Sequence, residues 1–476
     1  MSEASAAVLV ARRPVPLSWL TDLLRVSLAR PMWEAVAVVA LCPALLSGAL
    51  WNGFPLIFYD TGAYMLQGFA HRFVPERSPV YSLFIRYVGG GESLWFVAVV
   101  QTLLVAFVLV ETARALTPRL TLGTFFAIAT GLVVLTGLPW YAAQIEPDCF
   151  TPLAVLCLYL LAFHAAKLGW LRSFALVFIA ALAISSHPSH LGLAAGLVLG
   201  LALYKGFTLR ERWKSWPPPN LLLPMLAAAL GFGLIASGNY YFTRHVFISR
   251  AGPVFVFARM LQDGMVKEVL DETCPESHLR LCHYRNVLPN NAEKWLWGPG
   301  TPFLALHRFL GTERESEFVV RESVIRHPLS NLIVAARDAL EQFETFSTGD
   351  QIEPQQWILY PDFHRFIPDQ LHAYGMARQQ KGRMDFTIIN AVHEPVGWIA
   401  IALLIAMLAL SLQRGERRHS VLLGYVLIAL LGNALICGVF SNPHARYQSR
   451  LIWVPVFALT LLASEKLSLV NFSRGT

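Results

Sequence analysis

Long apolar runs separated by short polar connections constrain this chain more than any motif does. Most of the runs are about 17 to 22 residues long, which matches the thickness of a bilayer's hydrocarbon core. Of the 476 residues, 55% are hydrophobic and only 14% are charged, so the chain is far more apolar than a soluble protein. We expect an all-α polytopic membrane protein with about ten spans, within a range of roughly eight to twelve.

The expected helices follow directly from these runs. They cover 33–50, 94–113, 120–138, 151–166, 173–186, 191–204, 221–241, 396–412, 421–440 and 451–464. The fifth and sixth runs are short and are separated only by His187-Pro188-Ser189-His190. They therefore form either a tight hairpin or one interrupted helix.

Lys and Arg concentrate in alternate connections, which predicts the orientation. The basic stretches are the N-terminal segment 1–32, with Arg12, Arg13, Arg25 and Arg30, and the connections 114–119, 167–172, 205–214 and 414–418. The connections 139–147 and 187–190 contain no Lys or Arg. We therefore expect cytoplasmic termini, including a tail over 466–476, in an integral protein of a bacterial inner membrane. The first run is expected to be a signal anchor. The net charge of +7 needs no nucleic-acid partner to explain it.

Two segments on the extracytoplasmic side are long enough to fold. The first, 51–93, belongs to an N-terminal transmembrane module over 33–241, and the second is a loop domain over 242–394. The C-terminal membrane helices then occupy 395–465. The loop domain runs to roughly 150 residues, the size of a small domain.

Helical patterning in two stretches predicts that the loop domain is mostly helical. Apolar residues recur at helical spacing over 255–270 and over 315–346, and Thr312 precedes Glu315 with capping-box spacing. Between them, 281–310 is expected to be loop-like. Its aromatic residues either stack on sugars or pack in a core; they are Tyr284, Trp295 and Trp297.

The six cysteines divide by environment. Cys42, Cys157 and Cys437 lie in apolar runs, and Cys149 lies at a helix boundary. Cys274 and Cys282 share a polar loop on the oxidising side, which predicts a disulfide, with two free thiols as the alternative.

Charged residues gather at the ends of runs assigned to the extracytoplasmic side. The leading one is Asp60, within Tyr59-Asp60-Thr61-Gly62-Ala63-Tyr64, just beyond the first run. It either belongs to a chemical site or caps an interfacial helix over 61–69. The other members of this group are Glu146, Asp148, His187, His190, Arg446 and Arg450.

Four features occur in a characteristic order along the chain. They are Asp60 in the first loop, the stretch Arg77-Ser78-Pro79-Val80-Tyr81, the acidic pair Glu146 and Asp148, and Arg446-Tyr447 near the last helix. This arrangement resembles the GT-C superfamily of membrane glycosyltransferases, which includes the aminoarabinose transferases and protein O-mannosyltransferases. The resemblance covers mainly 33–205 and, more loosely, 440–464.

The resemblance implies that a sugar moves from a polyprenyl-phosphate carrier to an acceptor in the cell envelope, on the periplasmic face. Two departures leave the acceptor class, whether lipid, glycan or protein, and the dependence on a metal open. Thr61 follows Asp60 where many members have a second acid, and the large loop lies between the seventh and eighth helices.

The chemistry of such a transfer assigns roles to these residues. Displacing a phosphate from an anomeric carbon needs a base at the acceptor hydroxyl and positive charge on the leaving group. Asp60 is the expected catalytic base, and a single carboxylate opposite the leaving group would invert the anomeric centre. Arg446 and Arg450 are the expected phosphate ligands, because guanidinium groups match phosphate geometry. The alternative for both is snorkelling to ordinary headgroups of the membrane lipids.

The remaining candidates have less specific roles. Glu146 or Asp148 could bind sugar hydroxyls or hold a divalent cation, Mg or Mn, together with Asp60, or Asp148 could cap its helix. No cofactor is certain from the sequence. His187 and His190 could contact phosphate or orient a carboxylate, or form an interhelical hydrogen bond. Further candidates for substrate contacts are Arg77, Tyr64 and Tyr81.

Other classes of function stay open. A polysaccharide polymerase or ligase would share this topology but depend on paired arginines more than on Asp60. A transporter would place ionisable groups near the bilayer midplane, whereas these lie at helix ends. A membrane acyltransferase would need a buried histidine, for which His164 is the candidate, and a noncatalytic scaffold would need none of these residues.

Overall fold

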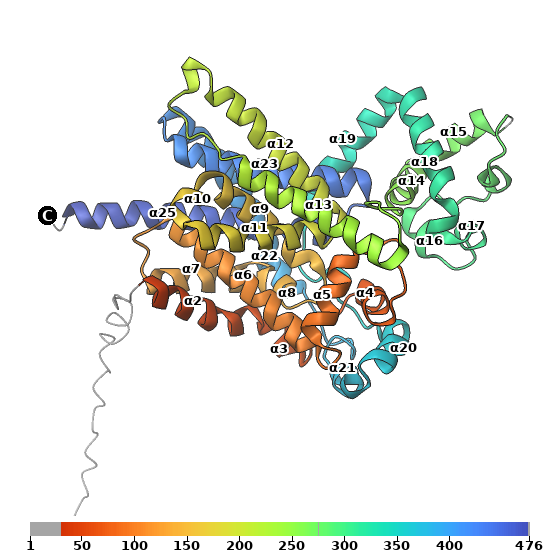
Figure 1. Cartoon of the computed structure of the whole chain (residues 1–476), viewed down its shortest axis with the longest axis horizontal. Helices are drawn as coiled ribbons and strands as arrows, with labels where there is room; N and C mark the ends of the chain where they lie inside the picture. Colours follow the sequence, from red (N-terminus) through yellow and green to blue (C-terminus); the bar gives the residue numbers. More distant parts are fainter. Residues whose placement is uncertain (1–29, 275, 475–476) are drawn as a thin grey trace, which may run out of the picture.

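The computed structural model describes residues 30–274 and 276–474, and this part of the chain is all-helical (Figure 1). Its strand-like pairing is a single isolated bridge between Leu56 and Gln144. Most of the predicted N-terminal segment, with Arg12, Arg13 and Arg25, and the last two residues of the predicted tail lie outside the described residues.

Six helices in the described part are long and apolar enough to cross a membrane, so the chain has the architecture of an integral membrane protein. They are Met32–Asn52, which comprises α2 (Arg30–Leu45) and α3 (Ser47–Asn52), α6 (Leu94–Leu116), α12 (Pro188–Thr208), α13 (Leu222–Thr243), α22 (Thr387–Gln413) and α23 (Arg417–Phe440).

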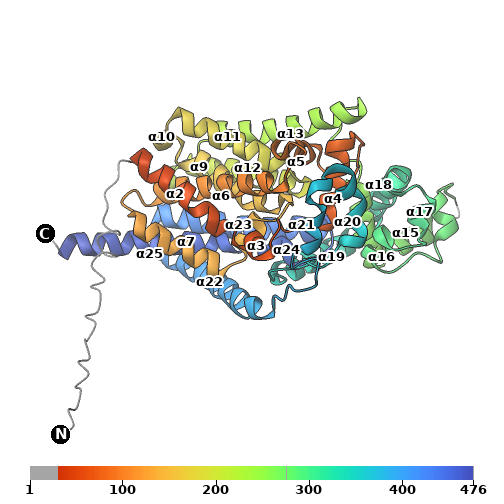
Figure 2. The same cartoon turned by 90° about the horizontal axis from the view of Figure 1, so that it is seen from below.

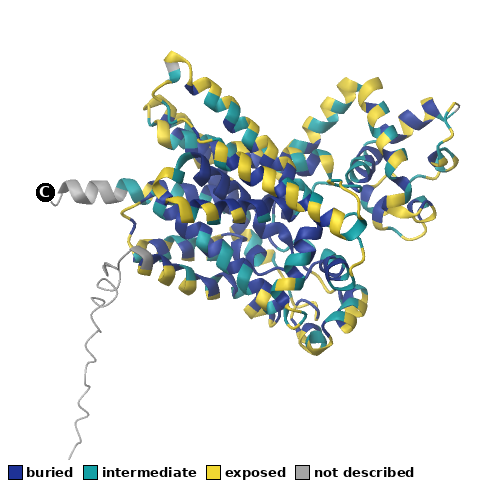
Figure 3. Ribbon diagram, viewed as in Figure 1, coloured by how far each residue is buried: buried dark blue, intermediate teal, exposed yellow. Residues whose placement is uncertain are grey.

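Three other predicted runs are helical but shorter than this standard, namely α7 (Leu122–Leu135), α9 (Phe150–Phe163) and α11 (Trp170–Ser185). The last predicted run lies in α25 (Trp453–Arg474). The expected number of about ten spans therefore stays a prediction. The helices pack around one large core at the centre of the bundle, which Figure 3 shows as mostly buried.

Helices α11 and α12 form a hairpin, which decides between the two arrangements expected for this region. Asn220 donates its backbone N–H to Ala162, and the rings of Phe163 and Tyr204 lie 6.2 Å apart. The C-terminal ends of α9 and α12 are therefore neighbours. Since α11 starts close after α9, through α10 (Ala165–Leu168), α11 and α12 run antiparallel.

The segment 51–93, which is the predicted first loop, contains two helices, α4 (Tyr59–Ala70) and α5 (Pro79–Gly89). Gly68 allows their close contact, because a Cβ at this position would lie 2.5 Å from the backbone oxygen of Ser82. Ser78 caps α5 by accepting a hydrogen bond from the backbone of Val80 at 3.2 Å. The loop therefore holds α4 in a defined position at the end of the bundle.

The predicted loop domain 242–394 divides into parts with different cores. Residues 251–326, here called the outer subdomain, contain α14 (Gly252–Gln262), α15 (Met265–Thr273), α16 (Ala292–Trp297), α17 (Pro302–Ala305) and α18 (Arg308–Arg326). They enclose a hydrophobic core of their own, around Phe257, Trp295 and Phe303. In Figure 1 this subdomain lies at the right-hand end of the molecule.

The second part of this segment belongs to the main body. Helices α20 (Gln356–Phe366) and α21 (Leu371–Met376) pack beside α3 and α4 (Figure 2), with Leu359 and Phe363 in the main core. Gln379 then binds the first loop with its side chain, which accepts from the backbone of Ile57 at 3.0 Å and donates to its carbonyl at 2.6 Å. Its own backbone N–H donates to Asn52. Helix α19 (Pro328–Glu344) packs against α23.

Several helix boundaries differ from the expectation. The predicted helix 255–270 breaks at Asp263 and Gly264, where Gly264 adopts a positive φ of 82°. The predicted helix 315–346 breaks at His327, because Pro328 starts a new helix and favours an extended residue before it. Helix α22 begins at Thr387, before the expected end of the loop domain at 394.

The capping-box prediction is wrong, and so is the loop-like assignment of 281–310. Thr312 lies inside α18, and its hydroxyl donates to the carbonyl of Arg308 at 2.8 Å. The stretch 281–310 contains α16, α17 and the start of α18. Glycine and proline mark helix ends here rather than a continuous loop.

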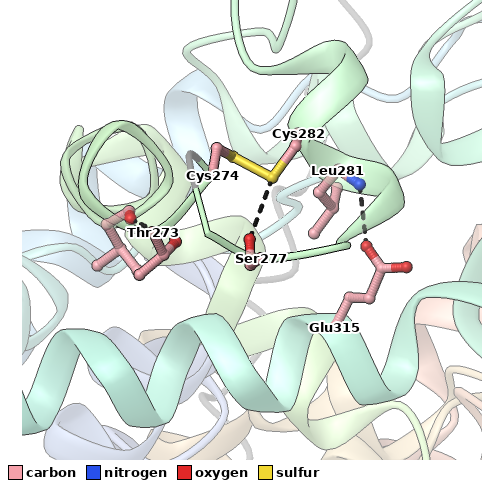
Figure 4. Close-up of a disulfide and its surroundings, with 7 residues drawn as sticks. Thr273, Cys274, Ser277, Leu281, Cys282 and Glu315 are labelled. Atoms are coloured by element: carbon pink, nitrogen blue, oxygen red, sulfur yellow. Dashed lines mark hydrogen bonds between the residues drawn. A yellow bond between two sulfur atoms is a disulfide. The ribbon is translucent and has the colours of Figure 1, made fainter.

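The predicted disulfide is present in the outer subdomain (Figure 4). Cys274 and Cys282 are bridged, with their Cα atoms 5.5 Å apart. The hydroxyl of Ser277 donates to the sulfur of Cys282, and Glu315 accepts from the backbone N–H of Leu281. The bridge therefore ties the segment after α15 to its own subdomain. Cys42, Cys149, Cys157 and Cys437 are buried and free.

Candidate functional site

A cavity of about 1070 Å³ lies between the end of the helical bundle and the outer subdomain. Its walls come from the first loop, from the start of α12, from α14, α16 and α20, and from the segment that follows α23. Its charged side includes Asp60, Arg77 and Arg446. Its apolar wall includes Ile436 and Phe440 of α23.

Asp60 lies in the first turn of α4 and forms an ion pair with Arg77. The expectation that Asp60 caps this helix is wrong. Phe58 occupies the cap position, and the hydroxyl of Thr61 accepts from its backbone N–H at 3.1 Å. Neither Asp60 nor Arg77 is far from solvent, since both line the cavity. The sequence placed both residues among the candidates, and the structure joins them.

Glu76 adds a second carboxylate to this part of the wall. Burial raises the pKa of the Glu76 carboxyl above its ordinary value, and the charge of neighbouring Arg77 opposes this rise. Beside it, Tyr59 donates to Glu353, and burial together with this acceptor raises the pKa of the Tyr59 hydroxyl to about 12. This side of the cavity therefore offers acceptors that can bind hydroxyl groups.

Arg446 is the cationic group on the opposite side of the charged region. Its guanidinium lies 3.5 Å from Asp148 and 3.7 Å from Glu146, and it stacks over Phe58 at 4.1 Å and Tyr447 at 4.8 Å. Its Nε has no hydrogen-bond partner in the described protein. The charges of Arg446 and Asp60 also interact electrostatically. The aromatic rings and the two carboxylates thus hold this guanidinium at the cavity wall.

Arg450 lies behind the cavity wall. It is 1% exposed, and its guanidinium donates to Asp148 at 2.5 Å, to Asn433 at 3.3 Å and to Ser189 at 3.4 Å. It is absent from the residues that line the cavity. The two arginines expected to bind phosphate are therefore separated, and only Arg446 faces the cavity. Snorkelling to lipid headgroups is wrong for both, because both are buried and paired.

Asp148 links the two arginines. Its two carboxylate oxygens accept from Arg450 and Arg446, at the start of the short η1 turn (Pro147–Cys149) that leads into α9. The residue at the cap position of α9 is Cys149, so the helix-capping role expected for Asp148 is wrong. Glu146 is buried beside it, and one of its oxygens has no hydrogen-bond partner in the described protein.

The two histidines separate in the same way. His187 lines the cavity and its ring contacts the hydroxyl of Ser189 at 2.8 Å. His190 is buried, and its ring nitrogens contact Thr151 of α9 at 2.6 Å and the carbonyl of Ala183 at 2.8 Å. The interhelical hydrogen bond proposed as one alternative is confirmed for His190.

Tyr64 and Tyr81 lie beneath the cavity instead of on its wall. Their rings meet edge to face at 4.8 Å, and the hydroxyl of Tyr81 donates to Gln101 at 2.7 Å. Both side chains are fully buried. They support α4 and α5 from below, so the structure does not place them where a substrate could touch them.

The charged region does not fit a divalent cation held by Asp60 and Asp148. Asp60 is paired with Arg77, and Asp148 with both Arg446 and Arg450, so a cation would face three guanidinium groups. Elsewhere in the described residues, a group with metal-ligand spacing is formed by Glu268, Glu272 and His327. That group is largely exposed on the outer subdomain, away from the residues that line the cavity.

Sequence reasoning missed one buried cation of the cavity wall. Arg259 of α14 is buried, binds Asp338 through its Nε at 2.8 Å and contacts Asn442 at 3.3 Å. The only signal for it was a lone arginine in an otherwise apolar helical stretch. Trp357 at the rim was also missed.

The aromatic residues proposed to stack on sugars have different positions. Trp297 lines the cavity and lies over the guanidinium of Arg77, 6.0 Å from it. Trp295 is fully buried in the core of the outer subdomain, and Tyr284 packs against the same core. Comparisons of the chain with protein-family models, with curated proteins and with solved structures found no match.

Proposed function

We propose that the chain is a membrane glycosyltransferase that moves a sugar from a polyprenyl-phosphate carrier to an acceptor on the extracytoplasmic side. The observation that carries this proposal is a single cavity that joins a charged region to an apolar wall made by membrane helices. A lipid-linked sugar has the same division, with a phosphate between a hydrophilic sugar and a long apolar chain.

The apolar wall reaches the outer surface of the bundle. Gly192 of α12 and both Ile436 and Phe440 of α23 line the cavity, and Phe440 is 55% exposed. Both helices are candidate membrane spans, so this side of the cavity opens where lipid chains would lie. A volume of about 1070 Å³ accommodates a sugar with its phosphate and the first part of a lipid chain.

The polar groups fit the two ends of the displacement reaction. Arg446, which lines the cavity, can bind the phosphate through its guanidinium, and the aromatic rings of Phe58 and Tyr447 keep that guanidinium in place. Asp60 lies where an acceptor can approach from the outer subdomain, and its ion pair with Arg77 orients its carboxylate.

In the proposed step, the acceptor hydroxyl oxygen forms a bond to the anomeric carbon while the bond from that carbon to the phosphate oxygen breaks. The hydroxyl proton passes to Asp60, and the polyprenyl phosphate leaves with the bonding electron pair next to Arg446. Attack from the side opposite the phosphate inverts the anomeric centre. Arg450 acts only through Asp148, which it holds against Arg446.

The experiment is a turnover assay on the full chain in nanodiscs with a panel of radiolabelled polyprenyl-phosphate sugars. We expect release or transfer of sugar by the wild type and a loss of about 10²-fold or more in Asp60→Asn, the size typical of a missing general base. Asp369→Asn is the matched control, because Asp369 is exposed in the η4 turn (Pro368–Gln370) outside the cavity.

The outcomes separate this proposal from its competitors. Full activity of Asp60→Asn with loss of activity in Arg446→Ala would favour a polymerase that depends on arginine. If no donor of the panel binds or turns over in the folded wild type, the glycosyltransferase proposal fails. Thermal unfolding of each variant shows whether a loss of turnover reflects a loss of folding.

A further inference from the structure

Helix α19 carries its apolar side chains on the outside. Leu329, Leu332, Ile333 and Leu340 are between 58% and 68% exposed. Their spacing of three, four and eleven residues from the first places them on one face of the helix. Ala336 is exposed on the same face. Figure 3 shows the exposed surface of α19 above the outer end of the bundle.

The opposite face of α19 is polar and buried. Asp338 and Gln342 are almost completely buried, and Asp338 binds Arg259. Gln342 exchanges two hydrogen bonds of 2.9 Å with the backbone of His444. This face packs so closely against α23 that a Cβ at Gly438 would lie 2.4 Å from the carbonyl oxygen of Asp338.

A third sector of the helix is polar and exposed. Ser330, Arg337, Glu341 and Glu344 follow the apolar face around the helix at 100° per residue. Arg337 there forms ion pairs with Asp263 and Asp338. The helix therefore has three sectors, which face the protein, an apolar medium and water. This is the division of a helix that lies in a membrane interface.

The polarity of α19 is the reverse of that of a helix in a water-soluble domain. Exposing a Leu or Ile to water forgoes the free energy of its burial, and α19 does so at four positions on one face. Exposed single apolar residues are ordinary on protein surfaces, but a continuous apolar face marks a contact. The contact is therefore with a hydrophobic partner.

The lipid bilayer is the partner that the surroundings of α19 favour. Its packing partner α23 is a candidate membrane span, and the apolar residues Ile428, Leu431 and Leu435 of α23 are between 48% and 54% exposed. The apolar face of α19 thus adjoins a surface that lipid chains cover. Val324 and Ile325, near the end of α18, are also exposed.

We propose that α19 is an interfacial helix, with Leu329, Leu332, Ile333 and Leu340 inserted among the acyl chains of the extracytoplasmic leaflet. Part of the segment expected to be a wholly aqueous loop domain then lies in the membrane. The helix also carries Asp338, which holds Arg259 at the cavity wall. The inference does not depend on the reaction proposed for the cavity.

Spin labels on the full chain in phospholipid nanodiscs test the proposal. Leu332→Cys and Ile333→Cys place labels on the apolar face, and Ser330→Cys is the matched control on the exposed polar sector of the same turn. Labelled wild type provides the background from the four free cysteines, which are buried. Leu329→Cys replaces either position if a variant folds poorly.

We expect the labels at Leu332 and Ile333 to relax several-fold more in the presence of oxygen, and several-fold less with a water-soluble nickel complex, than the label at Ser330. Equal access of the nickel complex to all three positions would overturn the proposal, because α19 would then lie in water. Poor access of both reagents to Leu332 and Ile333 would also overturn it and would indicate that protein, such as a second copy, covers the face.

Discussion

Two of the clusters of arginines and carboxylates in the described residues lie at opposite ends of the helical bundle. In the first, Asp148 binds Arg446 and Arg450 where α9 and α25 begin. In the second, Arg172 at the start of α11 donates to Glu34 at 2.9 Å and to Glu111, near the end of α6, at 3.0 Å. The first cluster adjoins the large cavity, whereas the second contributes no residue to its wall.

The difference teaches that burial of charge does not by itself mark a functional site. Both clusters bury charged groups, and both join helices that are far apart in the sequence. Of the two, only the first cluster presents a charged group, Arg446, to the wall of the cavity. A buried cluster that presents a charged group to an accessible volume is a candidate site. Four predictions test this distinction.

The largest effect is expected for Asp148→Asn. This change removes the principal counter-ion of both Arg446 and Arg450, and leaving buried charges unpaired costs roughly 3–5 kcal/mol. Thermal unfolding in detergent and binding of the lipid-linked donor should both show the loss. The matched control is Glu111→Gln, in which Arg172 keeps Glu34. Equal unfolding temperatures for Asp148→Asn and the wild type would contradict the assignment.

A smaller loss of stability is expected for Arg172→Gln. Glu34 and Glu111 lose their shared partner, which should cost roughly 2 kcal/mol because the arginine is partly exposed. Since this cluster lies away from the cavity, turnover per folded molecule should match the wild type. A folded Arg172→Gln protein without turnover would show that both clusters serve function and would contradict the distinction between them.

Within the first cluster, Arg446→Lys and Arg450→Lys should differ. A lysine at 446 loses the stacking on Phe58 and Tyr447 and the planar donor edge, so the KM for the donor should rise about tenfold, equivalent to 1.4 kcal/mol. A lysine at 450 should lower the unfolding temperature more than it changes the KM, because Arg450 does not face the cavity. The opposite ranking in steady-state kinetics would exchange the two roles.

The smallest effect concerns pH and Glu76. Because burial raises the pKa of the folded Glu76 carboxyl, the folded state holds this proton more tightly than the unfolded state. The stability that Glu76 contributes is therefore full at low pH and is lost as pH rises from its ordinary pKa through the raised one. At a pH at or below the ordinary pKa of glutamate, Glu76→Gln should unfold at the same temperature as the wild type. At neutral pH it should unfold at a slightly higher temperature than the wild type. A wild type whose unfolding temperature rises relative to that of Glu76→Gln as the pH increases would refute this.

The positions of most helices could be predicted from the sequence because apolar runs of bilayer length have few other structures available. The run 94–113 became α6, which ends three residues later at Leu116. The disulfide could also be predicted, because Cys274 and Cys282 share one short polar loop. The presence of Asp60, Arg77 and Arg446 in one cavity wall could be predicted only in part. Arg446 is positioned by its contact with Asp148, which lies 298 positions earlier in the sequence.

Helix α19 shows what periodicity alone does not determine. The spacing of Leu329, Leu332 and Ile333 indicates one apolar face but does not say which medium covers it. The structure buries Asp338 and Gln342 instead, because α23 offers Gly438 for close packing and because Arg259 and His444 satisfy the buried polar groups. Arg259 was missed for a related reason, since its partner lies 79 positions away.

The contact between Gln379 and the first loop has a consequence for the order of biosynthesis. The backbone groups of Ile57, three residues before Asp60, find their partners in a side chain that is 322 positions later. At translation rates of roughly 5 to 20 residues per second, the ribosome needs roughly 16 to 64 s to reach Gln379 after Ile57. A nascent chain therefore reaches the membrane long before the loop that carries Asp60 is complete. The cell thus makes this site late, and a truncated product that ends before Gln379 lacks the brace that holds it.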